Sequence, residues 1–167
     1  MKNTSDIFAV FDCNILIQAS ANSKSPASAC FRLAESKTVR LFVSESTLQE
    51  LELVLYRDYI KERFKFTDEV IGEFLDRVRN IATVVKNVPK VFSLPRDVDD
   101  EIYINLAVEA DADFIVTHDK DLIDLMSNYD IESKQFRQKF HPLKIVQPLE
   151  FLRIVEEKIK DTLDLKP

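Results

Sequence analysis

The segment FAVFDCNILI, residues 8–17, places an almost unbroken apolar run near the start of the chain. Ile7–Phe11 is apolar at every position, which is typical of a strand in a parallel sheet that is buried on both faces. Further strands are predicted, with helices between them, over residues 39–43, 82–86, 113–117 and 144–146. This alternation predicts an α/β fold in three layers, α/β/α, around a central and mainly parallel sheet.

Capping residues and apolar stripes mark the intervening helices. They are predicted over about residues 25–36, 44–56, 67–80, 97–110, 119–126 and 148–163. A chain of 167 residues is long enough for one domain. We therefore expect a single domain over residues 1–167, with a core at about 7–146 and a C-terminal helix at about 148–163.

The composition excludes several classes of site. Gly72 is the only glycine, so neither a P-loop nor a dinucleotide-binding fingerprint can be written in this sequence. The two cysteines and two histidines do not have the spacing of a zinc site. No signal peptide or membrane-spanning segment is recognisable, and we expect a cytoplasmic protein without a membrane partner. The net charge of −6 requires that any nucleic acid be bound by a local basic patch.

Two acidic residues follow predicted strands directly. Asp12 interrupts the first apolar run, and Asp119 comes shortly after the strand DFIVT, residues 113–117. Ligands of open α/β sheets bind at the carboxyl ends of the strands, so both carboxylates are expected at the same edge. A buried carboxylate without a partner is unfavourable by several kcal/mol or has a strongly shifted pKa. Asp12 therefore needs a companion that the local sequence does not supply.

Helical periodicity proposes further acids for this edge. In the helix predicted from Asp97, Asp100 points where the apolar residues point, whereas Glu101 and Asn105 fall on the side predicted to face solvent. Asp97 or Asp99 is interpreted as the N-cap of this helix. For Asp100 the pattern leaves two interpretations open: a residue of the site, or a carboxylate that only complements the helix dipole. In the helix after Ser44, Glu50 and Glu52 lie at opposite edges of the apolar stripe, and periodicity does not choose between them.

Carboxylates gathered in one place would repel each other. Two charges about 5 Å apart cost about 3 kcal/mol at an effective dielectric constant of about 20. Asp12, Glu50, Asp100 and Asp119 can therefore share one site in ionised form only if divalent cations are bound between them. Oxygen ligands without histidine or cysteine favour Mg²⁺ or Mn²⁺. Such ions activate water and stabilise a leaving oxygen in phosphodiester cleavage.

Between about Ile7 and Leu125 the chain resembles the PIN domain family. The resemblance is carried by VFDCNILI, by SESTLQELELVL and by DVDDEIYINLAVEADADFIVTHDKDLI, in this order and spacing. It is nearest to the PIN-type toxin components of toxin–antitoxin systems. It implies a metal-dependent endoribonuclease that uses Mg²⁺ or Mn²⁺ to cleave RNA, and that acts as the toxin of a type II pair, with an antitoxin partner and as a homodimer.

The resemblance also assigns residues. It implies that catalysis and metal binding are carried by Asp12, Glu50, Asp100 and Asp119, with Asp121 as a further ligand. It selects Glu50 over Glu52, and it assigns supporting roles to Asn14 and Thr117. Cys13 stands where the family usually has Thr or Ser, and His118 stands at a variable position. RNA binding is expected from the basic residues Lys61, Arg63 and Lys65.

Two other functions are weighed against this one. The chain could be a PIN module that binds RNA or a protein without cutting, although the presence of all four acids argues against it. An aspartate-based phosphohydrolase has a similar layout, but it requires a second aspartate two residues after the first. Asn14 occupies that position and cannot donate a proton.

Overall fold

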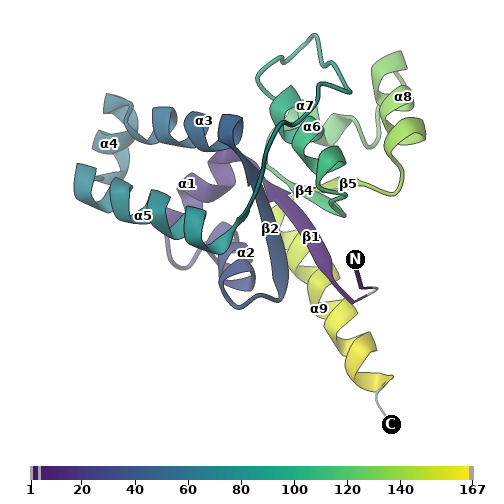
Figure 1. Ribbon diagram of the computed structural model, residues 1–167, viewed down its shortest axis with the longest axis horizontal. Coiled ribbons are helices and arrows are strands. Elements are labelled where there is room, and N and C mark those ends of the chain that lie inside the picture. Colours follow the sequence, from purple (N-terminus) through teal and green to yellow (C-terminus); the bar gives the residue numbers. More distant parts are fainter. Residues whose placement is uncertain (1, 4, 166–167) are drawn as a thin grey trace.

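A five-stranded parallel sheet forms the centre of the structure, a computed structural model that describes residues 2–3 and 5–165. The strands are ordered β3-β2-β1-β4-β5, and every neighbouring pair is parallel (Figure 1). They are β1 (Ile7–Phe11), β2 (Val39–Ser44), β3 (Thr83–Val85), β4 (Phe114–Val116) and β5 (Lys144–Val146). The predicted α/β class is confirmed. Positions 1, 4, 166 and 167 of the predicted domain lie outside the described residues, and the one-domain organisation stays a prediction.

Helices cover both faces of this sheet. α2 and α9 pack against each other and onto the strands, whereas α6 packs across β1, β2 and β4 (Figure 1). Phe151 of α9 makes edge-to-face contacts with Phe11 of β1 and Phe114 of β4. The helices are α1 (Cys13–Ala21), α2 (Pro26–Glu35), α3 (Glu45–Leu55), α4 (Asp58–Phe64), α5 (Asp68–Ile81), α6 (Glu101–Glu109), α7 (Lys120–Asp124), α8 (Ile131–Phe140) and α9 (Pro148–Asp164).

Three helix starts follow the predicted capping residues. The Ser25 side chain accepts a hydrogen bond from the Ser28 N–H, and Thr67 caps α5 in the same way. Ser44 and Thr47 form a reciprocal capping box at the start of α3, where each hydroxyl accepts from the backbone N–H of the other residue. These bonds satisfy N–H groups that have no partner within the helix, so the sequence alone positions these ends.

Three helices were not predicted, each for a different reason. α1 starts at Cys13 directly after β1, and its run Ile15–Ile17 is buried and cannot be told from a strand by periodicity. α4 has only seven residues, and its C-cap residue Lys65 adopts the left-handed conformation. α8 is largely polar and buries only Ser133 and Phe136.

The segment before α6 corrects a further prediction. α6 begins at Glu101, four residues after the predicted start, because residues 95–100 form turns. Glu101 and Asn105 are buried, so the prediction that they face solvent is wrong. Glu101 accepts a hydrogen bond from the Leu94 N–H at 2.8 Å and pairs with Lys90 at 3.0 Å. Residues 90–94 therefore contact the face of α6 that the sequence pattern assigned to water.

Asn105 holds the same segment through backbone hydrogen bonds. Its Oδ1 atom accepts from the N–H groups of Val91 and Phe92, both at 2.9 Å, and its Nδ2 atom donates to the Phe92 carbonyl at 3.3 Å. One amide side chain thus satisfies three polar groups of a segment that has no regular secondary structure of its own.

We predict that Asn105→Ala lowers the free energy of unfolding by about 1–3 kcal/mol, because it leaves two partly buried N–H groups without an acceptor. Glu109→Ala, an exposed site on the same helix, is the matched control and should change it by less than about 0.5 kcal/mol. Urea unfolding followed by circular dichroism measures both. Equal effects of the two substitutions would mean that Asn105 does not hold the segment.

Candidate metal centre

Asp12 lies at the carboxyl end of β1 and precedes the first residue of α1. The residue is 5% exposed, and its Oδ2 atom accepts a hydrogen bond from the Thr117 hydroxyl at 2.7 Å. Burial raises the pKa of Asp12, and the nearby charge of Asp119 raises it further, whereas the Thr117 hydroxyl and the N–H groups of Cys13 and Asn14 lower it. No Lys or Arg of the described chain forms an ion pair with it.

Thr117 connects Asp12 to the second acidic residue. The Thr117 side chain is fully buried just after β4, and its Oγ1 atom accepts from the Asp119 N–H at 2.9 Å while its hydroxyl donates to Asp12. Asp119 in turn caps α7 by accepting from the Asp121 N–H at 2.8 Å. A single hydroxyl therefore holds the carboxylate of Asp12, which follows β1, and the backbone of Asp119, which follows β4.

Three carboxyl groups form a compact cluster beside this pair. Asp97, Asp100 and Asp119 each offer an oxygen atom, and these atoms all lie within 4.8 Å of one another. Two ligands on opposite sides of a cation with bonds of about 2.0–2.6 Å are about 4–5 Å apart, so the spacing fits one ion. Asp100 is 8% exposed, and its buried Oδ2 atom has no hydrogen-bond partner. An oxygen-only site with an unpartnered carboxylate oxygen fits a hard divalent cation.

The cluster strongly perturbs the titration of Asp100. Burial, followed by the charges of Asp119, Asp97 and Asp12, raises the pKa of Asp100 to about 8. Burial disfavours the charged form, and each neighbouring carboxylate disfavours it again. Without a cation, Asp100 is therefore held largely protonated at neutral pH.

Glu50 reaches the same edge of the sheet from α3. It is half-buried, and its Oε2 atom accepts a hydrogen bond from the Tyr103 hydroxyl. Burial raises the pKa of Glu50, the Tyr103 hydroxyl lowers it, and the charge of Asp12 raises it. Glu52 instead is exposed and lies 3.8 Å from Arg79 of α5. Periodicity left these two residues equivalent, and the structure directs them to different surroundings.

The other predicted site residues lie around these carboxylates. Asp121 is turned toward Arg96, at 3.8 Å, and lies outside the three-carboxylate cluster. Asn14 and His118 are exposed, and the Asn14 side chain has no hydrogen bond to the described residues, so its supporting role stays a prediction. The sequence pattern predicts Asp97 only as a cap. It does accept from the Asp100 N–H at 3.3 Å, but it also belongs to the cluster, which its sequence position alone did not indicate.

The basic residues predicted to bind RNA lie on and just after α4. Lys61 is paired with Asp68 at 2.5 Å, whereas Arg63 and Lys65 are exposed and form no ion pair with the residues that the structure describes. Arg57 precedes α4, and its charge is close enough to lower the pKa of Glu50. The group of cationic side chains therefore lies near the acidic site at Arg57, the member closest to Glu50.

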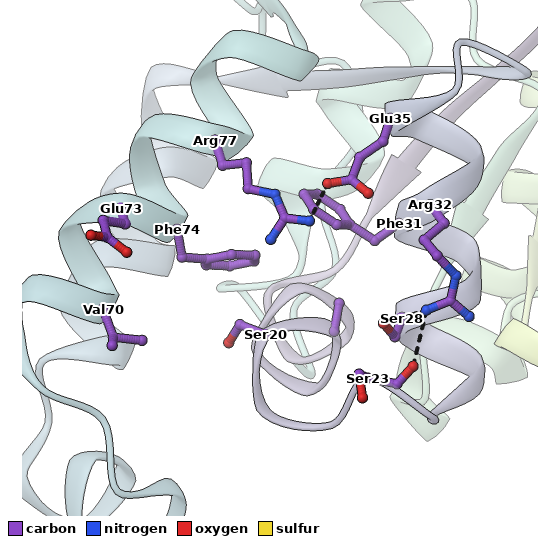
Figure 2. Close-up of a pocket in the computed structure, with 11 residues that line it drawn as sticks. Ser20, Ser23, Ser28, Phe31, Arg32, Glu35, Val70, Glu73, Phe74 and Arg77 are labelled. Atoms are coloured by element: carbon purple, nitrogen blue, oxygen red, sulfur yellow. Dashed lines mark hydrogen bonds and ion pairs between the residues drawn. The ribbon is translucent and has the colours of Figure 1, made fainter.

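A separate cavity of about 380 Å³ lies between α2, α5 and the end of α1. Figure 2 shows Arg77 of α5 directed toward Glu35 of α2, and Phe31 and Phe74 lining the space between these helices. Because none of the predicted metal-binding acids lines this cavity, it is distinct from the candidate metal centre.

The sequence profile of the PIN domain matches residues 9–121, more than half of the chain. The chain belongs to the PIN domain family. It is similar to the uncharacterized protein MJ1680 of Methanocaldococcus jannaschii, with 29% identity over 92% of this chain and 94% of that protein. Its fold is similar to the crystal structure of PAE2754 from Pyrobaculum aerophilum, with a TM-score of 0.55, 13% identity, and coverage of 92% of this chain and 94% of the other.

Family membership and geometry agree at a coarse level. PIN domains are in general metal-dependent nucleases, and this PIN domain carries an acidic cluster that fits a divalent ion.

In the part of the chain that the structure describes, no helix is both long and apolar enough to cross a membrane.

We predict that Asp100→Asn stabilises the metal-free PIN domain at high pH. The pKa of Asp100 is raised in the folded state, so the wild-type protein loses stability as the pH rises from about 4 to about 8. An asparagine has no such penalty, and we expect a melting temperature higher by about 4 °C or more at pH 8.5 and little difference near pH 4. Thermal melts with a chelator measure this.

The control is Asp99→Asn, which changes the exposed neighbour. It should leave both melting temperatures unchanged. Adding Mn²⁺ should raise the melting temperature of the wild type and of Asp99→Asn but not that of Asp100→Asn, because only the former bind the ion in the folded state. An Asp100→Asn variant that is less stable at every pH would instead assign Asp100 a structural role.

Proposed function

We propose that this PIN domain is a Mg²⁺- or Mn²⁺-dependent endoribonuclease. The observation that carries the proposal is the buried, unpartnered Oδ2 atom of Asp100, in a carboxyl group clustered with Asp97 and Asp119 at the carboxyl edge of the sheet. A protein retains such a group in this position when a bound cation completes it, because an unpaired buried charge is otherwise costly. Family membership supports the same class of chemistry.

In this proposal Asp12, Glu50, Asp100 and Asp119 hold the metal, with Asp97 beside them and Asp121 at the margin. When bound, a divalent cation supplies the Lewis acidity that activates water and stabilises the leaving oxygen of a phosphodiester. The protein's own contribution is positioning. Thr117 fixes one oxygen of Asp12 and the backbone of Asp119, and the Asp121 N–H fixes one oxygen of the Asp119 carboxylate. Both carboxylates are therefore oriented before any ligand arrives.

RNA is the proposed substrate, bound by Lys61, Arg63 and Lys65 together with Arg57. These residues follow α3, which also carries Glu50, and Arg63 and Lys65 are exposed and available for phosphate contacts. We further propose that the protein is a cytoplasmic toxin of a type II pair, with an antitoxin partner, and that it forms a homodimer. The resemblance of its motifs to PIN-type toxin components supports this role.

The test is cleavage of a fluorescent single-stranded RNA by the purified protein, with Mg²⁺, Mn²⁺ or a chelator, and with Asp12→Asn as the inactive control. A DNA oligonucleotide of the same sequence tests the preference for RNA. Metal-dependent cleavage that Asp12→Asn abolishes supports the proposal. Mn²⁺ binding without cleavage of any RNA would favour the module that binds without cutting, and hydrolysis of small phosphomonoesters alone would favour the phosphohydrolase.

We predict that Glu50→Gln lowers the cleavage rate by more than about 100-fold. Groups that only support a metal ligand are worth about 10- to 100-fold, and Glu50 is proposed as a ligand itself. Glu52→Gln is the matched control on the same helix, exposed and near Arg79, and should change the rate by less than about 2-fold. Rates measured at saturating metal and RNA compare the two variants. A larger loss of rate in Glu52→Gln than in Glu50→Gln would show that the assignment of Glu50 as the ligand is wrong.

We predict that a triple variant, in which Lys61, Arg63 and Lys65 are all changed to Glu, binds RNA more weakly than the wild type but has an unchanged Mn²⁺ affinity. Each phosphate contact releases counterions, so wild-type binding should weaken steeply between about 50 and 200 mM salt, and the triple variant should have a smaller slope. Arg153, Lys158 and Lys160 of α9, changed together to Glu, provide a charge-matched control. RNA binding that depends neither on the salt concentration nor on the three substitutions would contradict the electrostatic role of this patch.

A further inference from the structure

The Tyr103 side chain lies where three helices of the candidate site meet. It belongs to α6 and is 1% exposed. Its hydroxyl donates a hydrogen bond to Oε2 of Glu50 on α3. The oxygen of the Tyr103 hydroxyl also accepts a hydrogen bond from the Cys13 N–H at 3.3 Å. Cys13 is in the first turn of α1 and next to Asp12.

We propose that Tyr103 is a positioning residue of the metal centre, whose hydroxyl fixes the Glu50 carboxylate relative to Asp12. This inference rests on the proposed function, because it gives Tyr103 a part in assembling the site that binds the metal.

The hydroxyl is not needed for packing alone. A phenylalanine would fill the same space between α6 and the strands, and a buried hydroxyl is unfavourable unless it is hydrogen-bonded. Both of its hydrogen bonds are to groups of the site: one to a proposed ligand and one to the backbone beside another. The Cys13 N–H is one of the N–H groups at the start of α1 that have no carbonyl partner within the helix.

The contact also determines which part of Glu50 is free. Tyr103 occupies Oε2, whereas Oε1 accepts no hydrogen bond from the described residues. The hydrogen bond at one oxygen already restricts the rotation of the Glu50 carboxylate, so less conformational entropy is lost when an ion binds. The other oxygen stays available as a ligand. This is how hydrogen bonds to metal ligands from surrounding groups increase metal affinity.

The experiment compares Mn²⁺ affinity in four full-length proteins by isothermal titration calorimetry: wild type, Tyr103→Phe, Glu50→Gln and the double variant. We expect Tyr103→Phe to weaken Mn²⁺ binding by about 10- to 100-fold in the wild-type background. In the Glu50→Gln background the same change should have an effect of less than about 2-fold, because its target is gone. Tyr129→Phe, at an 84% exposed position, is the matched control and should not alter affinity.

A residue with only a structural role gives a different pattern. Tyr103→Phe would then lower the melting temperature but leave Mn²⁺ affinity unchanged, or it would weaken affinity equally in both backgrounds, and either result overturns the proposal. Titrations at 10 °C, with folding verified by circular dichroism, keep a destabilised variant measurable. RNA cleavage is not needed for this test, so a protein that binds Mn²⁺ through Tyr103 and Glu50 but does not cleave RNA contradicts the proposed ribonuclease and not this inference.

Discussion

β1 and β4 pair in parallel at the centre of the sheet, with Val10 opposite Ile115 and Phe11 opposite Val116. The Asp12 N–H extends this pairing by donating to the Val116 carbonyl at 3.0 Å, and the Thr117 hydroxyl then reaches the Asp12 carboxylate. At this point the strand order changes direction, which is where ligands of open α/β sheets bind. The site depends on this register, because a shift by one residue would turn Asp12 and Thr117 to opposite faces.

The electrostatics of this edge are unusual because several of its acidic side chains have no ion-pair partner within the described chain. Asp12, Asp100 and Asp119 form no ion pair, whereas Glu101, only one residue after Asp100, is paired with Lys90 and has its pKa lowered, first by that contact. Neighbouring acids are thus treated differently by the fold. Glu101 has an ion-pair partner in the protein, whereas Asp12, Asp100 and Asp119 are placed so that a cation from solution can neutralise them.

Much of the fold could be predicted because local signals agreed with the tertiary structure. β1 and β5 have the predicted bounds, and Ser25, Ser44 and Thr67 cap helices as expected. The failures occur where packing overrides a local pattern. Glu101 and Asn105 are buried although the pattern predicts that they face solvent. Periodicity describes one helix and contains no information about residues 90–94, which lie against it. The largely polar α8 lacked the stripe that would have predicted it.

The sequence by itself determined the parallel α/β class, the family, and the positions of Asp12 and Asp119 at strand ends, because apolar runs and their order along the chain encode these directly. Only the tertiary structure decided which acids meet. It brought Asp97 into the cluster, turned Asp121 toward Arg96, and placed the Tyr103 hydroxyl between Glu50 and Cys13. Such contacts join elements far apart in the chain, and their geometry depends on how α3 and α6 pack onto the sheet, which local sequence does not specify.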